Sequence, residues 1–348
     1  MNIVQSLPQD KELGFGIYFA PEMIVAHYKN SQWQKSEIIP TQNFQLHPAA
    51  KVLHYAQEIF EGLKAFNRKG EICLFRPHDN IRRMSISAEI MAMPPYPEED
   101  FLESMKVLVR KSSHLVPSKP GALYLRPTMI GTSTALGVAP ATEYLFFVLA
   151  SPVGGYFGKV AGDKPSGISI WVTSEYTRAA PGGLGVAKTG ANYAASLRAV
   201  AQGKKAGYSN VLFLDSERRK YIEELSGMNV FVVHNGVLKT SPLKDTILDG
   251  VTRRTLIELA KNLKIPFEET QVSIDDLIAG TTTGAFSEML ACGTGASVTA
   301  ISELGWKDQK ISINQGKIGP VTQVLYENLL AIQNGDKEPL HKDWIIKC

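Results

Sequence analysis

The stretch GGLGVAKTG, residues 182–190, decides the fold, because a lysine that ends a glycine-rich loop can serve two different chemistries. As an ammonium, Lys188 would hold a phosphate through its charge, as in nucleotide-binding proteins. As a neutral amine, it would attack a carbonyl carbon and form an imine. The first role requires a P-loop fold and the second does not, so the residues around the loop must decide.

The P-loop interpretation fails at one position. The pattern GxxxxGK[ST] matches residues 182–189 except at Ala187, where glycine lets backbone N–H groups close on the phosphates. A P-loop also follows directly on a buried strand, whereas EYTRAAP, residues 175–181, is polar and ends in proline. The apolar run NVLFLD, residues 210–215, would deliver an acid to Mg²⁺, so a P-loop-like nucleotide-binding protein stays an alternative. A surface lysine on a flexible loop also explains the stretch taken alone.

Composition indicates a globular protein without a nucleic-acid or membrane partner. The chain has 348 residues, of which 44% are hydrophobic and 20% charged, and its formal net charge of +3 is too small to favour an anionic partner. Its three cysteines form no CxxC pair and its seven histidines show no ligand spacing, so neither a metal site nor a disulfide framework is expected. Without a secretory-signal pattern or a bilayer-spanning apolar run, we expect a soluble, cytoplasmic protein.

Hydrophobic periodicity predicts a mixed α/β chain. Residues 16–20 and 23–28 are expected to pair as a hairpin, and Asn235-Gly236 predicts a second hairpin turn. The other expected strands are 71–76, 122–131, 143–153, 168–174, 210–215, 221–225 and 229–241. Helix periodicity and end signals predict helices over 78–93, 97–115, 191–207, 250–263 and 319–335.

A glycine-dense segment near the middle of the chain predicts a boundary between two domains. GGYFGKVAGDKPSG, residues 154–167, has little periodicity and is the best candidate for a linker. We therefore expect a small N-terminal α/β domain over 1–153, a linker over 154–166 and a large C-terminal domain over 167–348.

The strand YIEEL, residues 221–225, offers a buried acid. Side chains alternate along a strand, so Glu224 points to the core if Ile222 does, and Glu223 points the other way. A carboxylate in an interior costs several kcal/mol unless a cation meets it, and a protonated ring nitrogen would be such a cation. An edge strand with both glutamates in water explains the stretch equally well.

The stretch LDGVTRRTL, residues 248–256, offers an anion site. It begins a helix whose free N–H groups at Val251 and Thr252 suit a phosphate, while Asp249 is expected to turn away as the helix N-cap. A helix start that is only well capped would show the same residues. Amine, buried acid and phosphate site are nevertheless the three groups that a pyridoxal cofactor requires.

Seven segments of the chain occur in the order found in one enzyme family. They are HPAAKVLHYAQEIFEGLKAF, LFRPHDNIRRM, LYLRPTMIG, RAAPGGLGVAKTGANYAAS, EELSGMNVFVV, ILDGVTRRTL and GTGAS. With these segments, essentially the whole chain resembles the branched-chain amino-acid aminotransferases, which are pyridoxal 5′-phosphate enzymes of fold type IV. The resemblance implies an α+β, two-domain fold with the cofactor at the domain interface, a cofactor-binding C-terminal domain, and a homodimer.

The resemblance assigns the cofactor side of the site. Lys188 in KTGANY matches the lysine that forms the internal imine and moves the proton of the substrate. Tyr193 matches the donor to the phenolate oxygen, and Glu224 matches the acid on the pyridine nitrogen. Arg83 matches the phosphate arginine, a choice over Arg82 that rests on similarity alone. The remaining phosphate contacts match Val251, Thr252 and Thr294.

The substrate side is also implied by the resemblance. Arg126 in LYLRP is similar to the arginine associated with the dicarboxylate substrate, and a backbone N–H at Gly295 would hold the α-carboxylate. Gly295 stands where an alanine is usual, so this contact is expected to differ slightly. The aromatic residues at pocket positions, for which ordinary core packing is an equal alternative, are Phe15, Tyr55, Phe60, Tyr124 and Tyr156.

The implied activity is transfer of the amino group of L-leucine, L-isoleucine or L-valine to 2-oxoglutarate, in ping-pong fashion on pyridoxal 5′-phosphate. D-amino-acid aminotransferase and aminodeoxychorismate lyase share the lysine and the glutamate, so they stay alternatives within the fold type. The segments FEGLKAF and LYLRP favour the branched-chain class.

Overall fold

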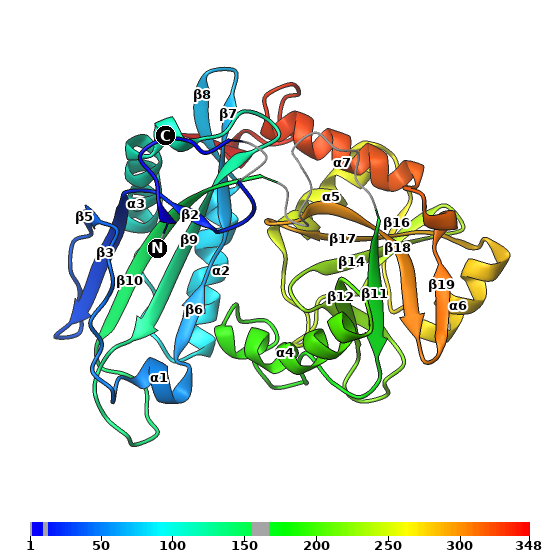
Figure 1. Cartoon of the computed structure of the whole chain (residues 1–348), viewed down its shortest axis with the longest axis horizontal. Helices are drawn as coiled ribbons and strands as arrows, with labels where there is room; N and C mark the ends of the chain where they lie inside the picture. The colour runs from blue at the N-terminus through cyan, green and yellow to red at the C-terminus, as the bar shows by residue number, and fades with distance from the viewer. Residues whose placement is uncertain (1, 10–12, 155–166) are drawn as a thin grey trace. The chain divides into compact units, whose positions relative to one another are not determined.

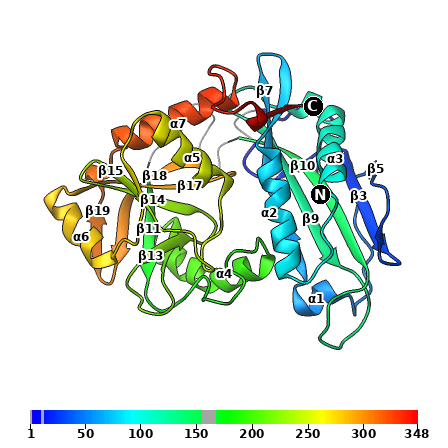
Figure 2. The same ribbon diagram turned by 180° about the vertical axis from the view of Figure 1, so that it is seen from behind.

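The computed structural model describes residues 2–9, 13–154 and 167–348, which form two compact units of mixed α/β structure (Figure 1, Figure 2). Unit 1 comprises Met1–Gly162, Ala187–Ala191 and Ala331–Cys348, and unit 2 comprises Asp163–Val186 and Asn192–Leu330. The predicted mixed α/β class is confirmed. All of the predicted linker except Gly154 lies outside the described residues, so the proposed domain limits of 1–153 and 167–348 stay a prediction.

Unit 1 is built on one large antiparallel sheet. Its strands are β3 (Glu22–Lys29), β4 (Gln32–Trp33), β5 (Glu37–Pro40), β6 (Glu58–Phe60), β7 (Leu63–Arg68), β8 (Glu71–Phe75), β9 (Ala122–Gly131), β10 (Tyr144–Val153) and β20 (Ile345–Lys347). Their order is β20-β8-β7-β9-β10-β3-β4, with β5 added to β3 and β6 added to β9. The C-terminal strand thus joins the sheet of the N-terminal half.

The core of unit 1 lies between this sheet and two helices, α2 (Pro77–Ile90) and α3 (Glu98–Lys111) (Figure 2). Side chains alternate along β9, so Leu123, Leu125 and Met129 face the helices while Tyr124 and Arg126 face the other way. The predicted apolar stripe of α3 is confirmed, because its four members are fully buried in this core: Phe101, Met105, Leu108 and Val109.

Unit 2 contains a mixed sheet. Its strands are β11 (Ile168–Thr173), β12 (Asn210–Leu214), β13 (Ile222–Leu225), β14 (Asn229–His234), β15 (Val237–Thr240), β16 (Phe267–Glu269), β17 (Phe286–Gly293), β18 (Ser297–Trp306) and β19 (Gln309–Ser312). The order is β13-β12-β11-β18-β17-β14-β15-β16, with β19 beside β18. β11 runs parallel to β12 and β18, and β15 runs parallel to β16.

The remaining helices are α1 (Lys51–Tyr55), α4 (Gly190–Lys205), α5 (Val251–Asn262), α6 (Ile274–Thr283) and α7 (Pro320–Gln333), with 3-10 turns at Ser113–Leu115, Asn314–Gly316 and Lys342–Trp344. Helix α6 was not predicted, although Ser273 accepts the N–H of Asp276 as an ordinary N-cap. Searched over the residues that the structure describes, no helix has the length and apolar character needed to cross a membrane.

One predicted hairpin is confirmed and the other is wrong. Asn235 and Gly236 both have positive φ (49° and 78°) and join β14 to β15. Residues 16–20 and 23–28 do not pair: β2 (Tyr18–Phe19) runs parallel to β1 (Asn2–Ile3) instead. Strand β3 has no edge to offer, because β10 occupies one side and β4 and β5 the other.

A buried carboxylate fixes the start of α7 in unit 2. Glu288 on β17 accepts the N–H groups of Val321 (3.0 Å) and Thr322 (2.8 Å) and the Thr322 hydroxyl (2.7 Å). These N–H groups have no partner within the helix, and the negative charge complements the helix dipole. Any side chain at Gly319 would collide with Glu288, so the sequence leaves glycine there.

We expect Glu288→Ala to lower the free energy of unfolding by about 2–3 kcal/mol, because several buried donors lose a charged acceptor. Chemical denaturation followed by circular dichroism measures this change. Glu303→Ala is the control, since Glu303 makes only a long, exposed ion pair with Lys310. Equal losses in the two variants would contradict the assigned role of Glu288.

Candidate active site

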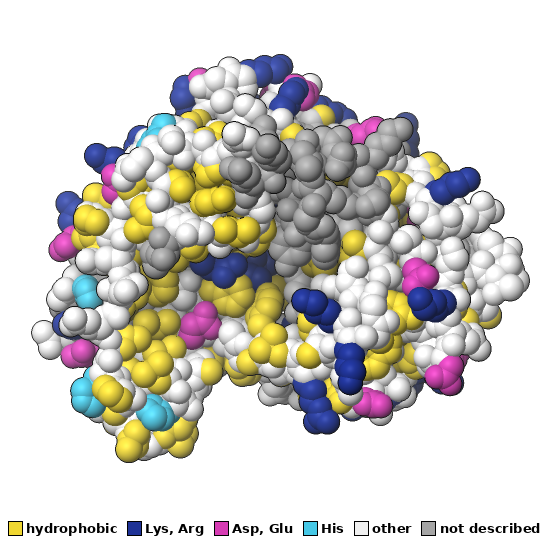
Figure 3. Space-filling view, viewed as in Figure 1, with side chains coloured by type: hydrophobic (Ala, Val, Ile, Leu, Met, Phe, Trp, Pro, Cys, Tyr) yellow, Lys and Arg dark blue, Asp and Glu magenta, His cyan; other side chains and the backbone are white. Residues whose placement is uncertain are grey.

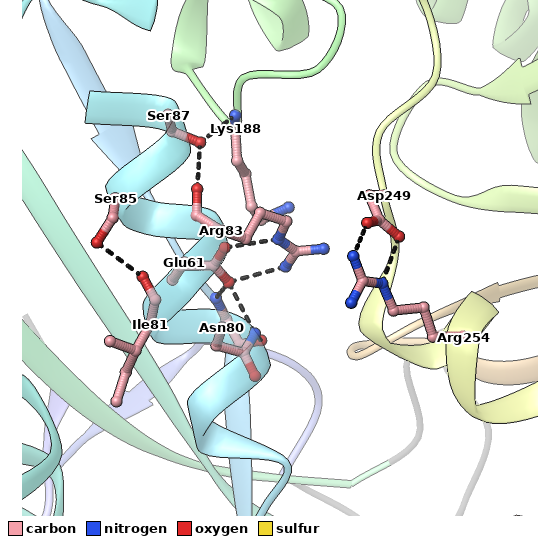
Figure 4. A network of polar contacts seen from close by, with 10 residues as sticks. Glu61, Asn80, Ile81, Arg83, Ser85, Ser87, Lys188, Asp249 and Arg254 are labelled. Carbon is pink, nitrogen blue, oxygen red and sulfur yellow. Dashed lines mark hydrogen bonds and ion pairs between the residues drawn. The ribbon is translucent and has the colours of Figure 1, made fainter. Parts of the chain in front are cut away.

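Lys188 is anchored through its backbone in unit 1. Its N–H donates to the hydroxyl of Ser87 on α2 at 2.9 Å, and its carbonyl accepts the N–H of Phe60 on β6 at 2.9 Å. The side chain is half-buried, and Nζ lies 4.8 Å from the centroid of the Phe60 ring. Figure 4 shows it beside Arg83 and Glu61. The lysine is therefore held in place by two separate segments of the chain.

A buried ion pair lies next to this lysine. Arg83 on α2 donates to both oxygens of Glu61, from Nε at 2.7 Å and from an Nη at 2.8 Å, and Asn80 donates to the same carboxylate at 2.8 Å (Figure 4). Burial raises the pKa of Glu61, but Arg83, Lys188 and Asn80 outweigh it and hold that pKa below its ordinary value. Arg82, in contrast, is exposed. The two neighbouring arginines thus occupy different environments, a distinction that helical periodicity could not supply.

Aromatic side chains surround a second arginine in unit 1. The guanidinium of Arg126 lies 4.7 Å from the centroid of the Phe60 ring and 5.3 Å from that of Tyr124, whose hydroxyl accepts a hydrogen bond from it at 2.8 Å. Phe15 packs edge-on against Tyr124, with ring centroids 4.8 Å apart. The structure therefore brings four of the predicted substrate residues together, with Lys188 over the same Phe60 ring.

The other two predicted aromatics of the pocket are placed differently. Tyr55 ends α1, is exposed, and donates its hydroxyl to the carbonyl of Leu136 in the loop between β9 and β10. Tyr156 lies outside the described residues.

Unit 2 carries a buried acid. Glu224 on β13 is 2% exposed; one oxygen accepts from Asn229 at 3.3 Å and from the N–H of Leu248, and the other lies 3.5 Å from Nε of Arg178. Strand β13 lies between β12 and β14, so the alternative of an edge strand with wet glutamates is wrong. Glu223 is buried as well and accepts the hydroxyl of Thr246 at 2.6 Å.

Arg178 and Asn229 hold the surroundings of this acid, and sequence reasoning missed both. Besides contacting Glu224, Arg178 donates to the carbonyls of Gly185 (3.0 Å) and Thr246. Asn229 donates to Glu224 and to the carbonyl of Leu248 at 2.9 Å. No pattern around either residue reveals these contacts, because each joins segments that are distant in the sequence.

The start of α5 is an open helix N-terminus. Its N-cap is Gly250, no side chain caps it, and Val251 and Thr252 occupy the first turn. Asp249 was expected as the N-cap, and this is wrong: its carboxylate is paired with Arg254 one turn into the helix (Figure 4). The N–H groups of the first turn are thus left for another acceptor.

Two further predicted residues lie elsewhere in unit 2. Tyr193 lies in the first turns of α4, and a β-carbon at Gly227 would lie 3.2 Å from its ring. Thr294 and Gly295 lie in the turn between β17 and β18. Gly227 therefore gives the Tyr193 ring its space, in the small-residue turn that follows Glu224.

The P-loop alternative does not fit the structure. Strand β11 ends at Thr173, so residues 182–190 do not follow directly on a strand. Asp215 was the candidate acid for Mg²⁺, but its carboxylate accepts the N–H groups of Arg218 (2.7 Å), Lys220 (2.8 Å) and Tyr221 (2.6 Å). Burial raises the pKa of Asp215, but these donors outweigh it and the pKa is lowered. The acid thus stabilises its own turn.

Comparison with known proteins gives a consistent result over nearly the whole chain. A family model described as Amino-transferase class IV matches residues 58–304. A probable branched-chain-amino-acid aminotransferase of Staphylococcus aureus (strain N315) is 41% identical over 333 residues, which cover 95% of this chain and 92% of the relative. The solved branched-chain amino acid aminotransferase of Escherichia coli gives a TM-score of 0.78 at 27% identity, covering 92% of this chain and 98% of its own. That of T.th., solved with pyridoxamine 5′-phosphate, gives a TM-score of 0.77 at 27% identity, covering 92% and 97%.

Removing the charge of Glu61 tests the buried ion pair. We expect Glu61→Gln to lower the free energy of unfolding by about 3–5 kcal/mol at neutral pH, because Arg83 stays buried without its counter-charge. The pKa of Glu61 lies below the 4.5 of the unfolded chain, so the pair stabilises fully above that pH. Its contribution is lost as the pH falls through the lower, folded pKa.

Urea unfolding at several pH values measures the difference between wild type and Glu61→Gln. The difference should shrink on acidification below the ordinary range of a glutamate. Glu103→Gln is the matched control, since it breaks a Glu–Arg pair with Arg110 that is half exposed and should cost less than about 1 kcal/mol. A difference for Glu61→Gln that is independent of pH would refute this assignment.

Proposed function

The chain belongs to the class IV aminotransferases, and from this premise we propose that it transfers the amino group of L-leucine, L-isoleucine or L-valine to 2-oxoglutarate. The products are the branched 2-oxo acid and L-glutamate. The observation that supports this substrate pair is the position of Arg126 between the rings of Phe60 and Tyr124. Such a wall is apolar enough for an aliphatic side chain and carries a cation for a second carboxylate.

The cofactor is pyridoxal 5′-phosphate, and the donor set of the chain fits it. When bound, this cofactor supplies an aldehyde and a ring that takes up the electron pair left when the Cα–H bond of the substrate breaks. In unit 2, the buried carboxylate of Glu224 suits the protonated ring nitrogen, and Tyr193 suits the phenolate oxygen. The open N-terminus of α5 suits a phosphate. We propose that the residues holding the cofactor are Arg83, Lys188, Tyr193, Glu224, Val251, Thr252 and Thr294.

Lys188 is the proposed catalytic residue. Its amine would bind the cofactor aldehyde and, once released by the incoming substrate, would accept the proton of the substrate Cα at Nζ. The two backbone hydrogen bonds of Lys188 support this role, because they hold the residue in place while its side-chain torsions can still change.

The proposed substrate site follows the same cluster. The aromatic wall of Phe15, Phe60 and Tyr124 would contact the aliphatic side chain, and Arg126 would bind the γ-carboxylate of glutamate. The N–H of Gly295 would bind the α-carboxylate. Tyr55 and Tyr156 are proposed substrate residues on the resemblance of their positions.

Replacing the lysine tests the catalytic role. We expect Lys188→Ala to lower the rate of glutamate formation from L-leucine and 2-oxoglutarate by about 10²–10⁴-fold, because general acid–base catalysis is lost. Cofactor binding should persist, and borohydride should fix the cofactor irreversibly in wild type but not in the variant. Lys244→Ala, which removes an exposed lysine, is the control.

Turnover of Lys188→Ala near the wild-type rate would contradict the proposed role. Assays of L-leucine against D-alanine with 2-oxoglutarate separate the branched-chain activity from that of the D-amino-acid enzymes.

We also propose that the protein is a homodimer through unit 1. Leu53 (58% exposed), Leu136 (67%) and Val138 (87%) form an exposed apolar patch with Tyr55 on α1 and the loop between β9 and β10. Figure 3 shows hydrophobic side chains gathered at this end of unit 1. An exposed apolar patch of this kind marks an interaction surface, and a second copy of the chain is the proposed occupant.

The double change Leu136→Asp with Val138→Asp should shift the protein from dimer to monomer at micromolar concentration, because two charges would be buried in the interface. Analytical ultracentrifugation measures the shift. Leu243→Asp, at an exposed apolar position of unit 2, is the control and should stay dimeric. A wild-type chain that sediments as a monomer would disprove the dimer.

A further inference from the structure

Glu58 is a carboxylate beside the proposed catalytic lysine that the proposed mechanism does not use. It begins β6, and its Oε2 accepts the N–H of Gly190, two residues after Lys188, at 2.7 Å. A β-carbon at Gly190 would lie 2.5 Å from the same oxygen, so the approach requires glycine. The backbone at the start of α4 therefore positions Glu58.

Two cations face Glu58, and neither neutralises it in a direct ion pair. Among the described residues, no lysine or arginine lies within 4.0 Å of its carboxylate. Arg126 on β9 and Lys188 nevertheless both act on it electrostatically. Burial raises the pKa of Glu58, and the Gly190 N–H, Arg126 and Lys188 only partly offset that effect. Glu58 is thus a partly buried charge whose compensation depends on what else enters its surroundings.

Arg126 is in the corresponding situation with the opposite sign. Its guanidinium packs on two aromatic rings and donates to the Tyr124 hydroxyl, and its buried Nε has no hydrogen-bond partner among the described residues. No carboxylate of the described residues pairs with it within 4.0 Å. Arg126 is therefore available to a carboxylate of a ligand, and Glu58 is the acid of its own unit that acts on it.

An enzyme with the proposed function must admit both a dicarboxylate and an aliphatic substrate at this wall. A fixed cation favours the dicarboxylate and disfavours the aliphatic side chain, because the cation would then be desolvated without a partner. A negative charge at some distance corrects both effects, since it compensates the cation when the aliphatic group is present and repels the second carboxylate when it is not.

Resting on the proposed function, we propose that Glu58 is a specificity-determining residue: its carboxylate lowers the preference of the Arg126 site for dicarboxylates relative to branched aliphatic substrates. Glu58 does this through its charge. The hydrogen bond from Gly190 sets its position.

The test compares two unreactive acids, glutarate and 4-methylvalerate, which mimic the carbon skeletons of the two substrates but carry neither an amino nor a keto group. Their dissociation constants are measured by calorimetry on the cofactor-loaded protein, for wild type and for Glu58→Gln. Glutamine keeps an acceptor for the Gly190 N–H and removes the charge. We expect glutarate to bind about tenfold more tightly to the variant, the size expected of one partly screened charge, and 4-methylvalerate not to gain.

Two more variants separate the charge from the fold. Glu58→Ser is neutral and should shift the ratio of the two dissociation constants in the same direction, also where glutamine is not tolerated. Glu58→Asp keeps the charge and should keep the wild-type ratio. A ratio within twofold of wild type in both neutral variants would overturn the inference, as would an equal shift in Glu58→Asp. Failure of the proposed function shows itself separately, as a wild-type chain that does not transaminate L-leucine.

Discussion

Two hydrogen bonds fix the backbone of Lys188, and the chemistry proposed for the chain depends on them. The Ser87 hydroxyl accepts its N–H and the Phe60 N–H donates to its carbonyl. With both groups satisfied, the peptide unit cannot rotate without leaving a buried polar group unpaired, which costs about 1–3 kcal/mol. Only the side-chain torsions can change, so the amine can move between a cofactor and a substrate without losing its place. The anchoring residues belong to α2 and β6, which are themselves fixed by the core of unit 1.

The buried carboxylates of the protein differ in how they are compensated, and the difference separates structural from adjustable groups. Glu61 has a guanidinium and an amide, Glu288 has a helix N-terminus, and Glu224 has an arginine beside it and two N–H donors. Each of these is held from several sides, so its charge is insensitive to what binds nearby. Glu58 has one backbone N–H and two cations at a distance. A carboxylate compensated so weakly responds to the charge of a ligand, whereas the others mainly orient their neighbours.

Local patterns predicted what local physics controls. Strand β9, helix α3 and the Asn235-Gly236 turn follow from alternation, helical spacing and backbone preference, and they were found where expected. The strand of residues 16–20 was paired wrongly, because the choice of partner depended on the edges of β3 that distant strands already occupy. The same limit explains why Arg178 went unnoticed, since its partners lie far along the chain. Similarity to a family supplied residue roles that neither alternation nor periodicity could supply.

The geometry of Arg126 shows how one wall can serve two kinds of ligand. A guanidinium is planar, so its faces pack against aromatic rings while its N–H donors point outward along its edge. Phe60 and Tyr124 take the faces, and the Tyr124 hydroxyl takes one edge donor. An aliphatic group can then pack on the rings without displacing the cation, and a carboxylate can reach the remaining edge without displacing the rings. A lysine at this position would offer a strongly hydrated point charge with no flat face, so it could not combine the two roles.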